Sequence, residues 1–153
     1  MGSKLDRNNV EDIIPLTSMQ EGMLFHYLTE LDSPEYHEQV IIGLIGDLNP
    51  DLFQKAWDFV ILRNEMLRTV YRWEDMNKPV QVILKNYEVI MRQYDFSKEA
   101  DKEKSLEELV QIDLKNRIDL KTETLRIYLC KYAEEEHTMV LRAYPTLTKY
   151  AIL

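Results

Sequence analysis

The close spacing of strand-like runs in the middle of the chain restricts its fold more than any other feature. Residues 67–73 and 80–84 both have strand character, and only a short turn ending at Pro79 separates them. Parallel neighbours need a crossover of about a dozen residues, so these two runs predict an antiparallel hairpin. Further strands are predicted at 39–45, 87–94, 124–131 and 138–144, and at 10–16, where Pro15 favours a sheet edge.

Three amphipathic helices are predicted between the strands. The first begins at Thr17 or Ser18, with Gln20 and Glu21 placed for a capping box. Gly22 lies inside this helix, which predicts that another segment packs closely on its backbone. The expected apolar face consists of Met19, Met23, Tyr27, Leu28 and Leu31.

The second helix is predicted at 49–66, with Asn49 as its cap and Pro50 in its first turn, and it is apolar enough to be mostly buried. The third is predicted from Ser105 to about Ile118. Residues 39–45 are apolar on both faces, which predicts a central strand. Together these elements predict an α/β (α+β) fold: a two-layer sandwich whose mixed, largely antiparallel sheet has its helices on one face.

Composition excludes several classes of function. The 153 residues suffice for one domain. A net charge of −8 opposes nucleic-acid binding, and no apolar run is long enough for a membrane helix. Cys130 is the only cysteine, so no internal disulfide forms, and a cytoplasmic location is expected.

No catalytic or metal-binding pattern is found in the residues themselves. His26, His37 and His137 have no partner at ligand spacing, and His37 and His137 are predicted in polar loops. There is no phosphate-binding glycine loop and no nucleophile elbow. Cys130 is predicted to be buried and inert, and residues 134–136 are predicted to form a solvated acidic turn.

Two motifs nevertheless make the chain resemble a known family. Residues 20–26 read Gln-Glu-Gly-Met-Leu-Phe-His, and residues 63–69 read Arg-Asn-Glu-Met-Leu-Arg-Thr. They are similar to the first two motifs of condensation domains from nonribosomal peptide synthetases, with Asn64 replacing a histidine of the second. The resemblance implies one lobe of the chloramphenicol-acetyltransferase type. It gives Gln20, Arg63, Glu65 and Arg68 the role of structural motif residues.

In the intact family, two lobes enclose a tunnel to which carrier proteins bring thioesters on phosphopantetheine arms. The family's His-His-x-x-x-Asp-Gly motif follows the strand corresponding to 138–143. Here its histidines fall on Tyr144 and Pro145, its Asp on Lys149 and its Gly on Tyr150. Arg68, whose family counterpart pairs with that Asp, would then face a lysine.

The resemblance therefore predicts a truncated lobe that binds no cofactor itself and does not catalyse amide formation. Residues 1–9 are expected to be disordered or tag-like, 10–141 to form the lobe, and 142–153 to be a divergent tail. Two alternatives remain open: a binding module for a peptidyl carrier protein or synthetase module, and one half of a split enzyme. The exposed lobe surface or the tail could also support a homo-oligomer.

Overall fold

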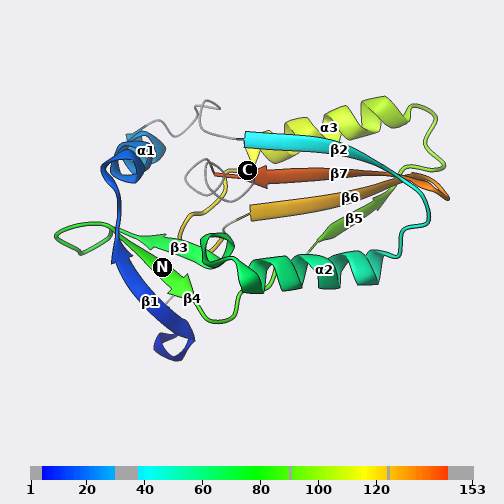
Figure 1. Ribbon diagram of the computed structural model, residues 1–153. Coiled ribbons are helices and arrows are strands. Elements are labelled where there is room, and N and C mark those ends of the chain that lie inside the picture. The colour runs from blue at the N-terminus through cyan, green and yellow to red at the C-terminus, as the bar shows by residue number, and fades with distance from the viewer. Residues whose placement is uncertain (1–4, 30–37, 90, 124, 145–153) are drawn as a thin grey trace.

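A computed structural model describes residues 5–29, 38–89, 91–123 and 125–144 (Figure 1). The helices are α1 (Ser18–Thr29), α2 (Pro50–Arg63) and α3 (Lys102–Lys115), with 3-10 turns η1 (Arg7–Asn9) and η2 (Glu65–Arg68). The strands are β1 (Val10–Pro15), β2 (Glu38–Ile45), β3 (Thr69–Arg72), β4 (Val80–Leu84), β5 (Arg92–Asp95), β6 (Leu125–Ala133) and β7 (Glu136–Ala143).

The strands form two sheets. The smaller is antiparallel, in the order β1-β4-β3, and contains the predicted hairpin of β3 and β4 as well as the predicted edge strand β1. The larger has the order β2-β7-β6-β5 and is antiparallel except for the β5–β6 pair, whose parallel strands are connected through α3. The predicted α/β class with a mixed, largely antiparallel arrangement is confirmed.

The prediction that the helices pack on one face is wrong, because α2 and α3 cover opposite faces of the larger sheet (Figure 1). Ile61 of α2 packs with Ile127 and other odd-numbered residues of β6. Leu109 of α3 packs with Tyr128 and Cys130, which point the other way. Alternating side chains of one strand thus serve two apolar layers.

The strand predicted to be central is an edge strand. β2 pairs only with β7 among the described strands, and its apolar residues are largely exposed, with Ile45 at 93%. Apolar residues on both faces suggested burial on both faces, but no helix or strand in the described part of the chain covers its outer side.

Two predicted helices differ in extent and burial. α2 begins as predicted, since the Asn49 side chain accepts from Asp51 N and Leu52 N, but it ends at Arg63, and η2 follows after the extended Asn64. Only Ile61 of α2 is fully buried, and Phe59 is 63% exposed, so the expectation of a mostly buried helix is wrong. α3 starts at Lys102, three residues earlier than predicted, with Asp101 as its cap.

The predicted cap of α1 is confirmed, but its apolar face is only partly right. Thr17 N donates to Gln20 Oε1 over 2.9 Å, and Gln20 N donates to Thr17 Oγ1 over 3.3 Å. Tyr27 is buried as expected, whereas Met19 and Leu28 are exposed. Gly22 has nothing within 4 Å of where a Cβ would lie, so no described segment packs closely on it. Residues 30–37, which include Leu31 and His37, lie outside the described residues.

Residues 5–9, the first of the described chain, contact the small sheet. Leu5 packs against the small sheet, and Asp6 caps η1. The Asn9 side chain donates to Asn86 O and accepts from Asn86 N, each over 2.9 Å. None of the three helices in the described segments is long and apolar enough to cross a membrane.

Candidate functional site

The C-terminal end of β7 is the position at which the sequence motifs place the reacting groups. Tyr144, directly after β7, is 1% exposed. Its hydroxyl donates to Met23 O of α1 over 2.8 Å, and its ring stands edge-on to Tyr27 at 5.5 Å. The side chain that replaces the first expected histidine is therefore fixed by α1.

An apolar cluster surrounds this tyrosine. It unites the end of β7 with α1, β3 and the segment between α3 and β6, through Leu16, Leu24, Tyr27, Tyr71, Ile118, Leu120 and Tyr144. The Tyr27 hydroxyl donates to Ile118 O over 3.0 Å, and the guanidinium carbon of Arg117 lies 3.5 Å from the Tyr27 ring centre. Burial raises the pKa of Tyr27 despite the nearby Arg117. A phenol held neutral in an apolar cluster is a packing group and not a general base.

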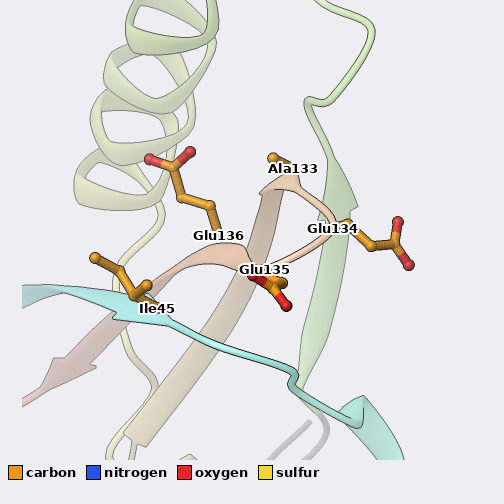
Figure 2. A pocket seen from close by; sticks show the side chains of 5 residues that line it. All are labelled: Ile45, Ala133, Glu134, Glu135 and Glu136. Atoms are coloured by element: carbon orange, nitrogen blue, oxygen red, sulfur yellow. The ribbon is translucent and has the colours of Figure 1, made fainter.

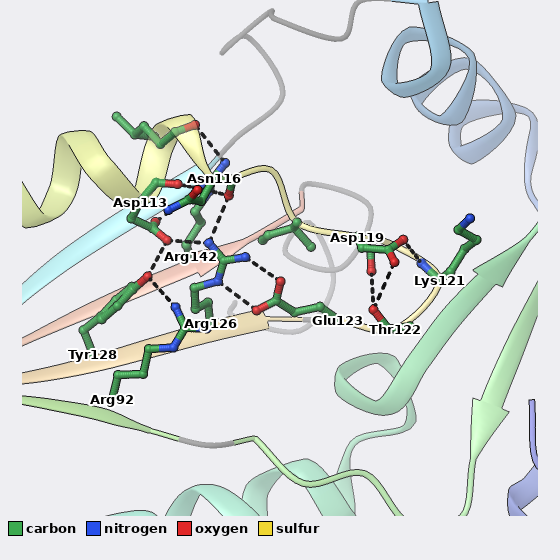
Figure 3. A network of polar contacts seen from close by, with 12 residues as sticks. Arg92, Asp113, Asn116, Asp119, Lys121, Thr122, Glu123, Arg126, Tyr128 and Arg142 are labelled. Carbon is green, nitrogen blue, oxygen red and sulfur yellow. Dashed lines mark hydrogen bonds and ion pairs between the residues drawn. The ribbon is translucent and has the colours of Figure 1, made fainter. Parts of the chain in front are cut away.

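Beside this cluster lies a buried polar network centred on Asp113 of α3 (Figure 3). Asp113 Oδ1 accepts from Arg126 of β6 and from the Tyr128 hydroxyl, each over 2.7 Å. Its Oδ2 lies 3.4 Å from a guanidinium nitrogen of Arg142 on β7 and accepts from Gln39 of β2 over 3.1 Å. One carboxylate thus connects α3 to three strands.

The two arginines also satisfy the end of α3. Arg142 donates to Asp113 O and to Asn116 O, and Arg126 also donates to Asn116 O. Cations at a helix C-terminus bind its last carbonyls and interact favourably with its dipole. Arg142 is completely buried, so these bonds replace part of the hydration that its guanidinium has lost.

Charge in the network is balanced locally. Burial lowers the pKa of Arg126, but its paired bonds to Glu123, of 2.8 and 2.5 Å, and its bond to Asp113 outweigh this and raise the pKa overall. Burial lowers the pKa of Arg142, with Asp113 opposing the shift. Burial and the Asp113 bond raise the pKa of Tyr128. Two acids and two bases therefore neutralise each other, which is typical of a structural network.

Two of the motif residues, in α1 and η2, are buried against the small sheet. Gln20 is 9% exposed and shares a 3.0 Å bond with the Gln81 side chain of β4, in addition to capping α1. Arg68 is 7% exposed, donates to Leu84 O over 2.6 Å and forms an ion pair with Glu11 of β1. These contacts join β1, β4, α1 and η2.

The other two motif residues lie at the surface. The guanidinium of Arg63 stacks 5.9 Å from the Phe59 ring, and the backbone carbonyl of Glu65 accepts from Thr69 over 2.7 Å. Pro145, Lys149 and Tyr150, the other positions of the degenerate motif, lie outside the described residues. The predicted approach of Lys149 to Arg68 is therefore untested.

Neither of the two histidines in the described residues lies at the end of β7. His137 lies within β7 and is 4% exposed, so the prediction of a polar loop is wrong. Its position seven residues before Tyr144 corresponds to roughly 23 Å along a strand. His26 is half-buried on α1, edge-on to the exposed Phe25. No three His, Cys, Asp or Glu side chains in the described ranges could hold a metal ion.

Two predictions about single side chains are confirmed. Cys130 is fully buried in β6, and burial raises its thiol pKa to about 11. Of the predicted acidic turn 134–136, Glu134 and Glu135 lie exposed in the turn between β6 and β7, whereas Glu136 is exposed as the first residue of β7.

The Asp113 network was missed, although the sequence carries a signal for it. Asp113 continues the apolar series Leu106, Leu109 and Val110 at helical spacing, and Arg142 interrupts an apolar strand. A charge at a core position of one element predicts an opposite charge at a core position of another.

Comparison with known proteins gives one consistent family. The family model described as "Condensation domain" matches residues 10–143. Bacitracin synthase 3 of Bacillus licheniformis is 31% identical over 137 residues, which are 88% of this chain and 2% of that protein. Tyrocidine synthase 2 of Brevibacillus parabrevis is 36% identical over 104 residues, which are 68% of this chain and 3% of that protein.

Solved structures show the same fold at lower identity. The starter condensation domain of rhizomide synthetase superposes with a TM-score of 0.76 at 20% identity, over 88% of this chain and 34% of that one. The first condensation domain of the calcium-dependent antibiotic synthetase gives 0.79 at 15% identity, over 89% and 34%. The chain thus spans about a third of these domain structures and a few per cent of the synthetases.

Proposed function

The chain belongs to the condensation-domain family of nonribosomal peptide synthetases over residues 10–143, and from this premise we propose that it is an N-terminal-lobe scaffold that forms no amide bond by itself. The observation that carries the proposal is Tyr144. It lies where the motif alignment places the first of two histidines, and both its ring and its hydroxyl are committed to contacts with α1.

A base with an accessible lone pair is what amide formation at this position would require. Tyr144 is 1% exposed and its hydroxyl donates to a backbone carbonyl. His137 lies at the opposite end of β7, and the half-buried His26 of α1 stands edge-on to Phe25 and not to Tyr144. No described histidine can therefore substitute at the end of β7.

Positioning is the second contribution that a condensation domain makes. Holding two thioesters in reacting geometry accounts for much of what such a catalyst supplies. The family resemblance assigns this task to the space between two lobes, with phosphopantetheine arms of carrier proteins entering it. The described residues correspond to one of these lobes, and the Asp113 network stabilises it behind the end of β7.

The test is a condensation assay with the 153-residue chain, a donor carrier protein loaded with an aminoacyl thioester and a loaded acceptor carrier protein. Intact-mass measurement of the acceptor should show no dipeptidyl product above a control without the chain, whereas an intact condensation domain should give product. Product formation by the chain alone would overturn the proposal.

A Tyr144→His variant provides a second test. It restores an imidazole at the first motif position but leaves the surrounding cluster in place, so we expect it to remain inactive. Activity in this variant but not in the wild type would show that the missing imidazole, and not a missing second lobe, limits the reaction.

A further inference from the structure

β2 is the one described strand at a sheet edge that has no feature preventing it from pairing with another chain. Edges are usually protected by charges, proline, bulges or short length. β1 has Glu11, Asp12, Pro15 and a register shift, and β5 is only four residues long with Arg92 and Asp95 at its ends. β3, the other edge of the small sheet, is also four residues long, and its Tyr71 N donates to Leu120 O over 2.8 Å. β2 pairs with β7 over eight residues without a register shift, and its only charge is Glu38 at one end.

The outer side of β2 is apolar on both faces. Leu44 packs on the α2 side, which places Val40 and Ile42 on the same face. Gln39 bonds to Asp113 of α3, which places Ile41 and Ile45 on the other. Val40, Ile41, Ile42 and Ile45 are 41%, 50%, 40% and 93% exposed. Unpaired backbone groups flanked by exposed aliphatic side chains suit β-sheet extension by a second strand.

We propose that the occupant of this edge is a second copy of the chain, with two β2 strands paired antiparallel about a two-fold axis at Ile41 or Ile42. Such an axis stands normal to the sheet, so residues of the same face lie opposite each other. Apolar residues then meet apolar residues across the centre, and Glu38 of one copy never faces Glu38 of the other. The result is a continuous sheet of eight strands, four from each copy.

Charge at the two ends of the pair determines its salt dependence. Ile45 pairs with Glu136 at the start of β7, beside the turn that carries Glu134 and Glu135 (Figure 2), and Gly46 N donates to Glu135 O over 2.8 Å. In the antiparallel pair this acidic turn comes near Glu38 of the other copy. Association is therefore opposed at low salt and strengthened when salt screens the repulsion.

Sedimentation velocity at about 5 to 500 µM measures the association directly. We expect a weak dimer, because the apolar contact is smaller than the ~1,600 Å² of a standard interface. Raising NaCl from about 50 to about 500 mM should tighten it several-fold. Glu38→Lys, which faces the acidic turn with a cation, should tighten it at low salt.

Matched lysine substitutions locate the interface. Ile41→Lys should abolish the dimer, whereas Ile13→Lys on the protected edge β1, where Ile13 is 55% exposed, should leave it intact. Circular dichroism of both variants verifies that they are folded. A dimer that survives Ile41→Lys, or that Ile13→Lys disrupts equally, overturns the assignment to β2.

Oxidative cross-linking gives a second readout. In a two-fold antiparallel pair the residue on the axis has its own counterpart about 4.5–5.5 Å away between Cα atoms, within disulfide range. Either Ile41→Cys or Ile42→Cys should cross-link, while Ile13→Cys should not. The native Cys130 is buried and does not interfere.

A monomer at every concentration together with no cross-link refutes the proposal. A monomeric full chain that dimerises only after removal of residues 145–153 also refutes it, since the edge would then be occupied by the chain's own segment. Neither outcome bears on catalysis, so this inference and the proposed function fail independently.

Discussion

Replacing Asp113 by Asn should be among the most destabilising single changes in the protein. The substitution keeps the shape of the side chain and removes the charge that faces Arg126 at 2.7 Å and Arg142 at 3.4 Å. Both side chains of the Asp113–Arg142 pair are 0% exposed, so Arg142 would remain buried without its counter-ion. Breaking a buried pair in this way costs about 3–5 kcal/mol.

That cost is large relative to the whole stability, which is about 5–15 kcal/mol for a domain of ordinary size. For a chain of about 150 residues, each kcal/mol lowers Tm by roughly 2–4 °C, so the expected decrease is roughly 6–20 °C. Urea unfolding followed by circular dichroism measures the free energy, and thermal unfolding gives Tm.

The matched control is Glu108→Gln on the same helix. Glu108 is 65% exposed and lies 4.0 Å from Lys104, so its loss should change stability by less than about 0.5 kcal/mol. The double variant Asp113→Asn/Arg142→Met removes the isolated cation and should recover part of the loss. A decrease below about 1 kcal/mol for Asp113→Asn would refute the view that one carboxylate neutralises both arginines.

Three further predictions concern single side chains. Gly22→Ala should stabilise the protein by about 0.5–1 kcal/mol in urea unfolding, because alanine favours a helix interior and its methyl group meets nothing within 4 Å; destabilisation would mean that a segment packs there after all. Gln20→Ala should lower the free energy of unfolding by about 1–3 kcal/mol, because it removes the cap of α1 and leaves the buried Gln81 amide without that partner. Gln20→Glu keeps the cap and should therefore cost less. The pKa of the Cys130 thiol is 9.0 in the unfolded chain and about 11 in the folded protein. The free energy of unfolding should therefore be unaffected below pH 9 and fall between pH 9 and 11. If this free energy falls equally steeply with pH in the wild type and in Cys130→Val, the prediction is contradicted.

Local signals in the sequence identified most elements of the fold. Asn49 and Pro50 fixed the start of α2, Thr17 and Gln20 the cap of α1, and the short turn before Val80 the hairpin of the small sheet. Each of these depends on groups within a few positions of one another, so no tertiary information is needed.

Burial was harder to predict, because it depends on what lies outside each element. The apolar residues of β2 and α2 suggested interior positions, yet Ile45 and Phe59 are among the most exposed. Apolar composition shows that a surface favours burial, but not which partner covers it. The two helices were assigned to one face of the sheet because periodicity gives the apolar side of a helix and not the side of the sheet on which it lies.

The candidate site shows the same limit. Family motifs directed the search to the end of β7, and the absence of the histidine motif there motivated the prediction of an inactive lobe. They did not reveal that Tyr144 is fixed by Met23, or that Asp113 supports the strand from behind, because those contacts join residues 121 and 29 positions apart.

The pairing of β2 with β7 has a consequence for synthesis of the chain. β2 joins the sheet through Glu38–Ala143 and Ile45–Glu136, so its partner is translated roughly a hundred residues later. At about 5–20 residues per second, a nascent strand of Val, Ile and Leu waits about 5–20 s before β7 exists. During that interval both of its edges are open, and the ribosome-bound chain is at its most vulnerable to aggregation.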